Sequence, residues 1–186
     1  IPLRLVGSEM CIRDRSFNLL DPIFYDFNSL IESNQSEYDL FGFSAGAQFV
    51  HRMTLLDSTS HVRNFISASA GWYTLPDTTI NFPYGLKNIH GSQTQRQEQL
   101  FRSFSKKHVI IVGSEDNDPN SSDLRHTSEA DAQGSNRYDR AYYFLAEGIS
   151  ISGQSQIPFS WTLQVVPQVG HSGQGMGSFA INMLYP

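Results

Sequence analysis

Three residues whose types together support nucleophilic catalysis follow one another along this 186-residue chain: Ser44, Asp116 and His171. A serine hydroxyl is a weak nucleophile until an imidazole removes its proton, and a carboxylate holds that imidazole in the right tautomer and stabilises its positive form. Taken singly, each has a plainer interpretation, as a turn serine, a capping aspartate or a surface histidine. Their joint occurrence after successive predicted strands favours a catalytic triad.

Two aspartates compete for the place of the acid. Asp116 lies three residues beyond Gly113, near the predicted end of a strand, and is preferred. Asp118 precedes Pro119, as turn-forming aspartates often do, and is kept as the alternative acid.

The serine lies in the pattern Gly42-Phe43-Ser44-Ala45-Gly46, between an apolar segment and a helical pattern. This is the strand, sharp turn and helix of a nucleophile elbow. We expect the serine to occupy a strained backbone position, and both glycines to be small so that strand and helix approach closely. The N–H of Ala45, at the helix N-terminus, is the expected oxyanion-hole donor.

The elements that must position these groups alternate along the chain. Helical periodicity predicts helices over residues 16–33, 45–56, 93–104, 136–147 and from about 177 onward. Short apolar runs predict strands at 40–43, 62–70, 108–112 and 159–166, the first as a buried strand. This order predicts an α/β class with a parallel sheet and helices on both faces, whose carboxyl edge collects the three candidate groups.

The neighbouring sequence indicates roles for several other residues. Phe43, with Trp72 and Tyr73 of the aromatic loop over residues 71–88, is a candidate for a substrate pocket, although packing of the loop against the core is an equal alternative. His51 is expected to be a surface or capping residue. The glycine-rich residues 173–177 are expected to form a turn that leads into the last helix.

Composition excludes some functions. The net charge of −5 comes without a basic stripe, which argues against nucleic acid as a partner. No apolar run reaches the roughly 20 residues of a membrane span. The six histidines lack metal-ligand spacing, so neither a metal nor a cofactor is expected. Compartment and oligomeric state are not indicated.

The first fifteen residues, IPLRLVGSEMCIRDR, differ from the rest. They contain neither the apolar core nor the cleavage site of a signal peptide, and they resemble a translated sequencing-adapter peptide. We therefore expect residues 1–15 to be non-native and the native part of the chain to comprise residues 16–186. A natural disordered arm is the alternative. The single cysteine, Cys11, lies in this segment.

Longer blocks carry a family resemblance, and they span residues 40–176. These are YDLFGFSAGAQFVHR, SASAGWYTLPD, FPYGL, VGSEDNDPN, LRHTSEADAQGSNRYDRAYYF and VGHSGQGM. Together they resemble the poly(3-hydroxybutyrate) depolymerase-like group of α/β-hydrolases. The resemblance implies a partial α/β-hydrolase fold and a cofactor-free serine hydrolase acting on a small-molecule or polymeric ester, with Ser44, Asp116 and His171 as the triad. Phe43 departs from the histidine that is frequent at its position.

Alternative functions stay open at this point. A complete α/β-hydrolase has strands before the elbow and a loop that donates the second oxyanion-hole N–H. Only one predicted helix precedes the elbow here, so residues 16–186 are expected to be the C-terminal part of an α/β-hydrolase domain and to be inactive alone. The alternatives are a catalytically inactive hydrolase-like binding domain and an amide- or peptide-cleaving relative.

Overall fold

The computed structural model describes residues 16–57, 60–89 and 91–186, and a four-stranded parallel sheet forms its centre. The strands are β1 (Tyr38–Phe43), β2 (Val62–Ala68), β3 (His108–Gly113) and β4 (Thr162–Val166), hydrogen-bonded in the order β1-β2-β3-β4. The predicted α/β class and parallel sheet are confirmed. The expectations for residues 1–15, Cys11 included, lie outside the described residues.

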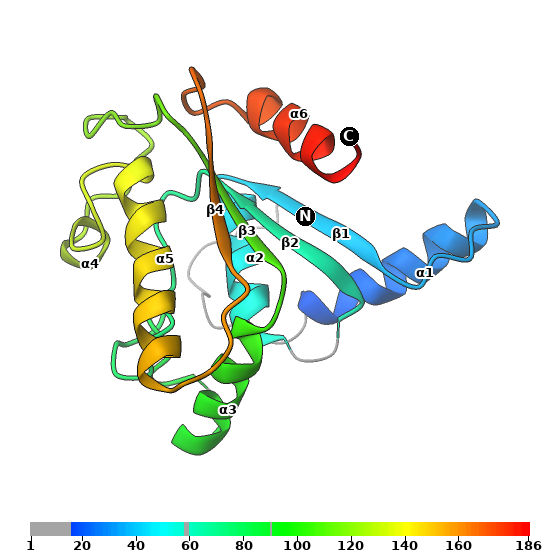
Figure 1. Cartoon of the computed structure of the whole chain (residues 1–186), viewed down its shortest axis with the longest axis horizontal. Coiled ribbons are helices and arrows are strands. Elements are labelled where there is room, and N and C mark those ends of the chain that lie inside the picture. Colours follow the sequence, from blue (N-terminus) through cyan, green and yellow to red (C-terminus); the bar gives the residue numbers. More distant parts are fainter. Residues whose placement is uncertain (1–15, 58–59, 90) are drawn as a thin grey trace, which may run out of the picture.

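The described helices cover both faces of this sheet (Figure 1). They are η1 (Phe17–Leu19), α1 (Leu20–Leu30), α2 (Ala45–Leu56), α3 (Gln93–Phe104), α4 (Ser128–Asp131), α5 (Arg137–Gln154) and α6 (Gly173–Leu184). On one face, Ile110 and Val112 of β3 pack in the core that α2, α3 and α5 cover. On the other face, Ile111 packs with Met176 of α6. The central strand is therefore buried on both sides, as its apolar run predicts.

Several elements differ from the sequence-based prediction. Helix α5 continues to Gln154, beyond the predicted end near residue 147, and the short helix α4 forms where no element was predicted. Helix α6 begins at Gly173, so the glycine-rich residues 173–177 form its first turns and not a separate turn. The hydroxyl of Ser172 accepts a hydrogen bond from the Gly175 N–H, and this cap fixes the helix start.

Strand β1 lies at one edge of the sheet and pairs only with β2 among the described residues. Phe41 of this strand is 38% exposed, so the predicted buried strand is wrong for this position. An exposed strand edge offers unpaired backbone groups to any neighbouring chain.

No helix in the described ranges combines the length and the apolar character that a membrane span requires. The longest, α5, carries charged residues in its first turns and its middle, including Arg137, Asp139, Arg140 and Glu147.

Candidate active site

Ser44 occupies the sharp turn between β1 and α2. Its backbone angles, φ 54° and ψ −111°, lie outside the regions that a residue with a side chain normally adopts. The Ser44 N–H donates to the Ala68 carbonyl of the neighbouring strand at 2.9 Å, which holds the turn at the sheet edge. Helix α2 starts at the next residue, Ala45, whose N–H is one of those without an intrahelical acceptor.

Only one of the two elbow glycines is required by close packing. A Cβ on Gly42 would lie 2.2 Å from the Gly46 carbonyl oxygen and 2.8 Å from the Val50 side chain. A Cβ on Gly46 would meet nothing within 4 Å in the part of the chain that the structure describes. The expectation that both must be small is therefore corrected: the strand residue meets the helix backbone, while the side-chain direction of Gly46 is open.

Ser44, His171 and Asp116 form one hydrogen-bonded chain. The Nε2 atom of His171 lies 3.2 Å from Ser44 Oγ, and its Nδ1 atom lies 2.9 Å from Asp116 Oδ2. Because a carboxylate can only accept at Nδ1, the imidazole carries its proton there, and Nε2 is free to accept the serine proton. Asp116 is buried and His171 partly exposed, so the acid is shielded while the base is reachable from solvent.

The loops that carry Asp116 and His171 are held together by backbone contacts. The Glu115 N–H donates to the Val169 carbonyl at 3.0 Å, and the Asp116 N–H donates to the Gly113 carbonyl at 3.1 Å. A Cβ on Gly113 would lie 2.0 Å from the Val169 oxygen, so this glycine allows the loop after β4 to approach the end of β3.

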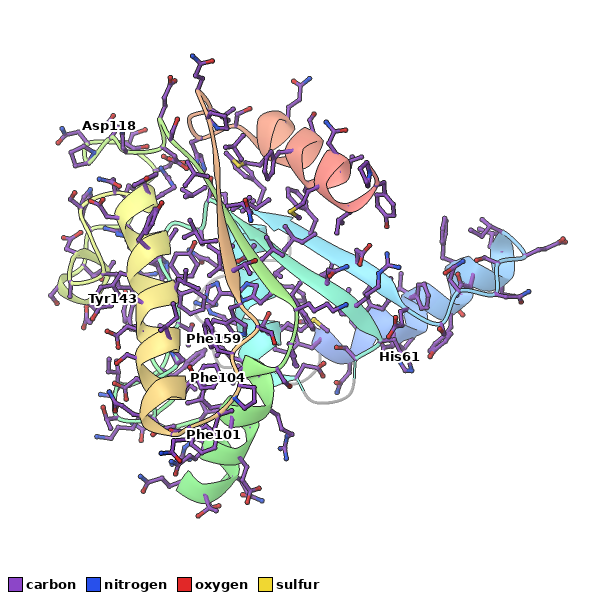
Figure 2. All side chains as sticks on the ribbon, in the orientation of Figure 1. His61, Phe101, Phe104, Asp118, Tyr143 and Phe159 are labelled. Carbon is purple, nitrogen blue, oxygen red and sulfur yellow. The ribbon has the colours of Figure 1, made fainter. Side chains whose placement is uncertain are left out.

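Among the described residues, no hydrogen bond joins Asp118, the alternative acid, to the imidazole of His171. The Oδ1 atom of Asp118 accepts a hydrogen bond from the Asn120 N–H at 2.8 Å, the pattern of an Asx turn. The side chain is exposed and lies at the outer end of the loop after β3 (Figure 2).

A buried arginine contacts the candidate acid directly. Nη1 of Arg137, at the start of α5, lies 3.4 Å from Asp116 Oδ1, and Nη2 lies 2.9 Å from Asp123 Oδ1. Asp123 was not predicted as a site residue, although its Oδ2 atom lies 3.8 Å from His171 Nε2. Hydrogen bonds from Ser121 and Arg137 lower the pKa of Asp123 to about 2. The only sequence signal for it was its place in the acid-bearing loop.

The three aromatic residues predicted for the pocket occupy different surroundings. The ring of Phe43 packs on His171 with centroids 4.6 Å apart. Tyr73 is fully buried, stacks on Phe144 at 4.5 Å, and contacts His51. Burial, and then the charge of Asp116, raises the pKa of the Tyr73 hydroxyl, so it stays a neutral phenol. Trp72 is also buried. Packing explains Trp72 and Tyr73 directly, and the pocket roles stay predictions.

Two polar side chains from the segment before and within α5 fasten the loops around the site. Both the N–H and the carbonyl of Tyr73 bond to the Gln133 side-chain amide at 2.8 Å. Arg140, with no exposed surface, donates to the carbonyls of Gly71, Arg125 and Gly134 and to the Asp131 carboxylate.

His51 is fully buried, which corrects the expected surface or capping role. Its Nδ1 atom lies 3.0 Å from the Ala47 carbonyl, and its Nε2 atom accepts from the Thr74 N–H at 2.9 Å. Burial holds the pKa of His51 well below its ordinary value, so the imidazole is a neutral core group. Among the described residues, no three His, Cys, Asp or Glu side chains are grouped as metal ligands are.

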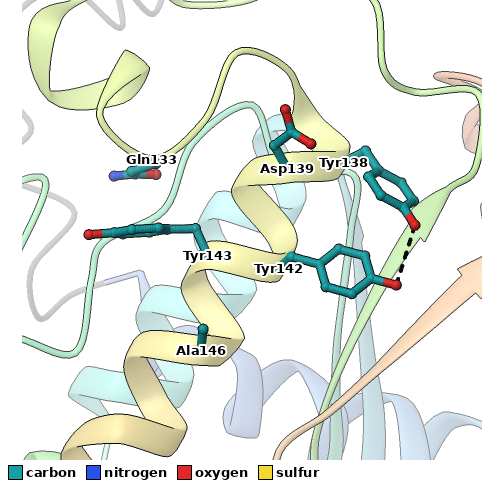
Figure 3. Close-up of a pocket in the computed structure, with 6 residues that line it drawn as sticks. All are labelled: Gln133, Tyr138, Asp139, Tyr142, Tyr143 and Ala146. Atoms are coloured by element: carbon teal, nitrogen blue, oxygen red, sulfur yellow. Dashed lines mark hydrogen bonds between the residues drawn. The ribbon is translucent and has the colours of Figure 1, made fainter.

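A cavity of about 620 Å³ lies along the outer face of α5 and is lined by none of the three triad candidates. Figure 3 shows its lining: Tyr138 and Tyr142 lie together with their hydroxyls 3.3 Å apart, and Tyr143 projects toward Gln133. The Tyr138 N–H donates to the Asp116 carbonyl at 3.1 Å, so the cavity begins next to the acid loop.

Comparison with known proteins supports this fold. No family model matches the chain, and no curated protein does. Among the similar solved structures is poly(aspartic acid) hydrolase-1 from Sphingomonas sp. KT-1, with a TM-score of 0.86 and 33% identity over 92% of this chain. Another is LpqC, a poly(3-hydroxybutyrate) depolymerase from Bordetella parapertussis, with a TM-score of 0.83 and 30% identity over 91% of this chain. The chain spans 63% and 57% of their lengths. Over the part of the domain that it spans, the chain has the α/β-hydrolase fold of the poly(3-hydroxybutyrate) depolymerase-like group.

Proposed function

We propose that this chain carries the catalytic residues of a serine hydrolase that cleaves an ester-type bond through an acyl-enzyme. The supporting observation is the continuous hydrogen-bonded chain from Ser44 through His171 to Asp116, which starts at a strained elbow residue at the head of a helix. In this proposal Ser44 is the nucleophile, His171 the general base and acid, and Asp116 the residue that orients the imidazole.

Acylation would follow from these distances. His171 Nε2 takes the Ser44 proton while Oγ attacks the carbonyl carbon, and the carbonyl π electrons move to the oxygen. The Ala45 N–H and the N-terminal end of α2 stabilise the resulting oxyanion. Asp116 stabilises the imidazolium formed at this step, and its burial keeps water from weakening that interaction.

Release of the first product uses the same proton. The imidazolium donates it from Nε2 to the leaving alkoxide as the tetrahedral intermediate collapses to the acyl-enzyme. Water then attacks the acyl carbon, with His171 again accepting a proton, and Ser44 leaves with that proton restored. The residues need no cofactor for this sequence.

The class of substrate is inferred from the fold's neighbours. The two similar structures are hydrolases of polymers, one of them a polyester. We propose a carboxylic ester, small or polymeric, as the substrate. An amide linkage would pass through the same tetrahedral intermediate, and comparing matched ester and anilide substrates separates the two.

A second oxyanion-hole donor lies outside what the described residues supply. Hydrolases of this fold take one such N–H from a loop that follows a strand preceding the elbow, and no strand precedes β1 in the described part. Because loss of one donor typically lowers kcat by about 10²–10³-fold, we expect residues 16–186 alone to hydrolyse an activated ester at least that much more slowly than a hydrolase of this fold that has both donors.

The decisive experiment is active-site labelling of the protein as naturally made. A fluorophosphonate should attach to Ser44, and Ser44→Ala and His171→Ala should each abolish both labelling and ester hydrolysis with the fold intact by circular dichroism. Absence of labelling from a folded protein would favour the alternative of an inactive hydrolase-like binding domain.

A further inference from the structure

A second carboxylate faces the catalytic imidazole from the side on which the substrate must bind. Asp123 Oδ2 lies 3.8 Å from His171 Nε2, the same nitrogen that lies 3.2 Å from Ser44 Oγ. The Asp123 side chain is 60% exposed, whereas that of Asp116 on the opposite side of the ring is 4% exposed. A substrate bound at Ser44 is therefore within range of the Asp123 charge.

The positive charge beside these carboxylates is not available to a substrate. The Arg137 side chain is 2% exposed, and its two terminal nitrogens are used by Asp116, Ser121 and Asp123. Two carboxylates against one guanidinium leave the cluster with one net negative charge while the imidazole is neutral. A carboxylate on a substrate would find no free guanidinium in this cluster.

The surrounding loop adds charge of the same sign. Residues 114–123, SEDNDPNSSD, contain four acids and no base. Hydrogen bonds hold the pKa of Asp123 at about 2, so it is ionised at any ordinary assay pH. The next basic residue along the chain, Arg125, lies over the rings of Trp72 and Tyr84.

We propose that Asp123 is a specificity-determining residue that selects esters without negative charge near the scissile bond over esters that carry a carboxylate there. This inference rests on the proposed function and adds the charge of the substrate to it. Two charges about 6 Å apart, in an effective dielectric constant of about 40 to 80, change a rate ratio by about 3- to 10-fold.

The test compares two substrates with the same acyl group, 2-nitrophenyl butyrate and 3-butanoyloxy-4-nitrobenzoate, whose carboxylate cannot reach its own ester carbonyl, in the protein as naturally made. The measured quantity is the ratio of kcat/KM for the neutral ester to kcat/KM for the anionic ester. Any effect of Asp123 on the imidazolium acts on both substrates and cancels in this ratio. We expect Asp123→Asn to reduce the ratio by about 3- to 10-fold and Asp123→Glu to keep it.

Two controls decide between a local and a general charge effect. Asp118→Asn removes a carboxylate from the same loop at an exposed position that bonds only within its own turn, and should leave the ratio within about twofold. In the unmodified protein, raising the salt concentration should shrink the ratio, because partly exposed charges are screened, and this measurement needs no variant to fold.

Each outcome bears on the proposal. An unchanged ratio in folded Asp123→Asn, or an equal drop in Asp118→Asn, overturns it while leaving ester hydrolysis established. If the unmodified protein hydrolyses neither ester, the proposed function fails, and the selectivity falls with it. A ratio near one in the unmodified protein at low salt also overturns the proposal.

Discussion

Replacing Arg140 with methionine should lower the free energy of unfolding much more than the same change at a surface arginine. Arg140 has no exposed surface, and its guanidinium donates to the carbonyls of Gly134 at 2.8 Å, Gly71 at 2.6 Å and Arg125 at 3.0 Å. A fourth bond reaches Asp131 at 2.8 Å. Methionine fills most of the volume but donates none of these bonds.

The magnitude follows from the acceptors left behind. A buried acceptor that loses its partner costs about 1–3 kcal/mol, and three carbonyls are affected. Since these carbonyls belong to partly exposed loops, water will replace some of the lost bonds, and we expect a decrease of about 3–5 kcal/mol in the free energy of unfolding. Lysine retains a charge but not the planar fork, so Arg140→Lys should fall between the two.

The matched control is Arg63→Met. Arg63 pairs with Asp39 at 2.5 Å, but its side chain is 44% exposed, and exposed ion pairs contribute little to the free energy of unfolding. Urea unfolding at pH 7, monitored by circular dichroism and fitted with one m value for all variants, measures both changes. If Arg140→Met lowers the free energy of unfolding by no more than Arg63→Met does, the assignment of Arg140 as the residue that fastens these loops is refuted.

Three further perturbations test the elbow, the acid and the buried histidines. Gly42→Ala should lower the free energy of unfolding by about 3 kcal/mol or more, because its Cβ would overlap the Gly46 carbonyl. Gly46→Ala should be neutral or raise it by up to about 1 kcal/mol. Thermal unfolding of the two variants compares these changes, and equal losses of stability would contradict the geometry. Asp116→Asn should lower kcat for an activated ester by about 10⁴-fold and Asp118→Asn by less than about twofold, and the reverse order would reassign the acid. Burial lowers the pKa of His108 from its ordinary value to about 3, so below about pH 6.5 the unfolded chain binds a proton that the folded chain does not. Between pH 6 and 4.5, His108 should therefore lower the free energy of unfolding by about 1.4 kcal/mol per pH unit, and His51 should add to this decrease. Urea unfolding at several pH values measures the dependence, and a His108→Gln variant with the same dependence on pH would contradict this explanation.

Local signals were sufficient for the elements that carry their own start and stop. The bounds of α2 and α3 agree with the sequence-based prediction. The elbow pattern of residues 42–46 marks the start of α2, and a capping box between Ser92 and Gln95 marks the start of α3. The run HVIIV identified β3 because a strand buried on both faces has no polar side.

Tertiary packing decided the boundaries that sequence reasoning missed. Glycines lower helix propensity, so residues 148–153 and 173–177 read as non-helical. In the fold, a Cβ on Gly148 would lie 2.9 Å from the ring of Phe159, so this glycine lets α5 pack closely on the segment before β4. Met176, in the first turns of α6, packs against the sheet and stabilises a helix start that propensity disfavours.

The residue types of the candidate site were predictable, but the partners around them were not. Ser44, Asp116 and His171 each follow a strand, and parallel strands bring their carboxyl ends to one edge, so topology alone predicts that they meet. Arg137 and Asp123 reach the same place from a helix and a long loop, for which no periodicity sets a position. Their contact with the triad required the path of residues 114–136 in three dimensions.

The choice between the two aspartates illustrates what that path decides. The loop after β4 is anchored to the loop after β3 where Glu115 donates to Val169, and Gly113 is the residue that allows the backbones to come this close. Once this contact is made, Asp116 is the next residue, and a turn back to the Gly113 carbonyl points it at the imidazole, which follows Val169 by two residues. Asp118 comes after that turn and closes one of its own with Asn120. The aspartate that contacts the imidazole is thus selected by a backbone contact between two loops, and a sequence motif that records only residue types cannot distinguish the two candidates.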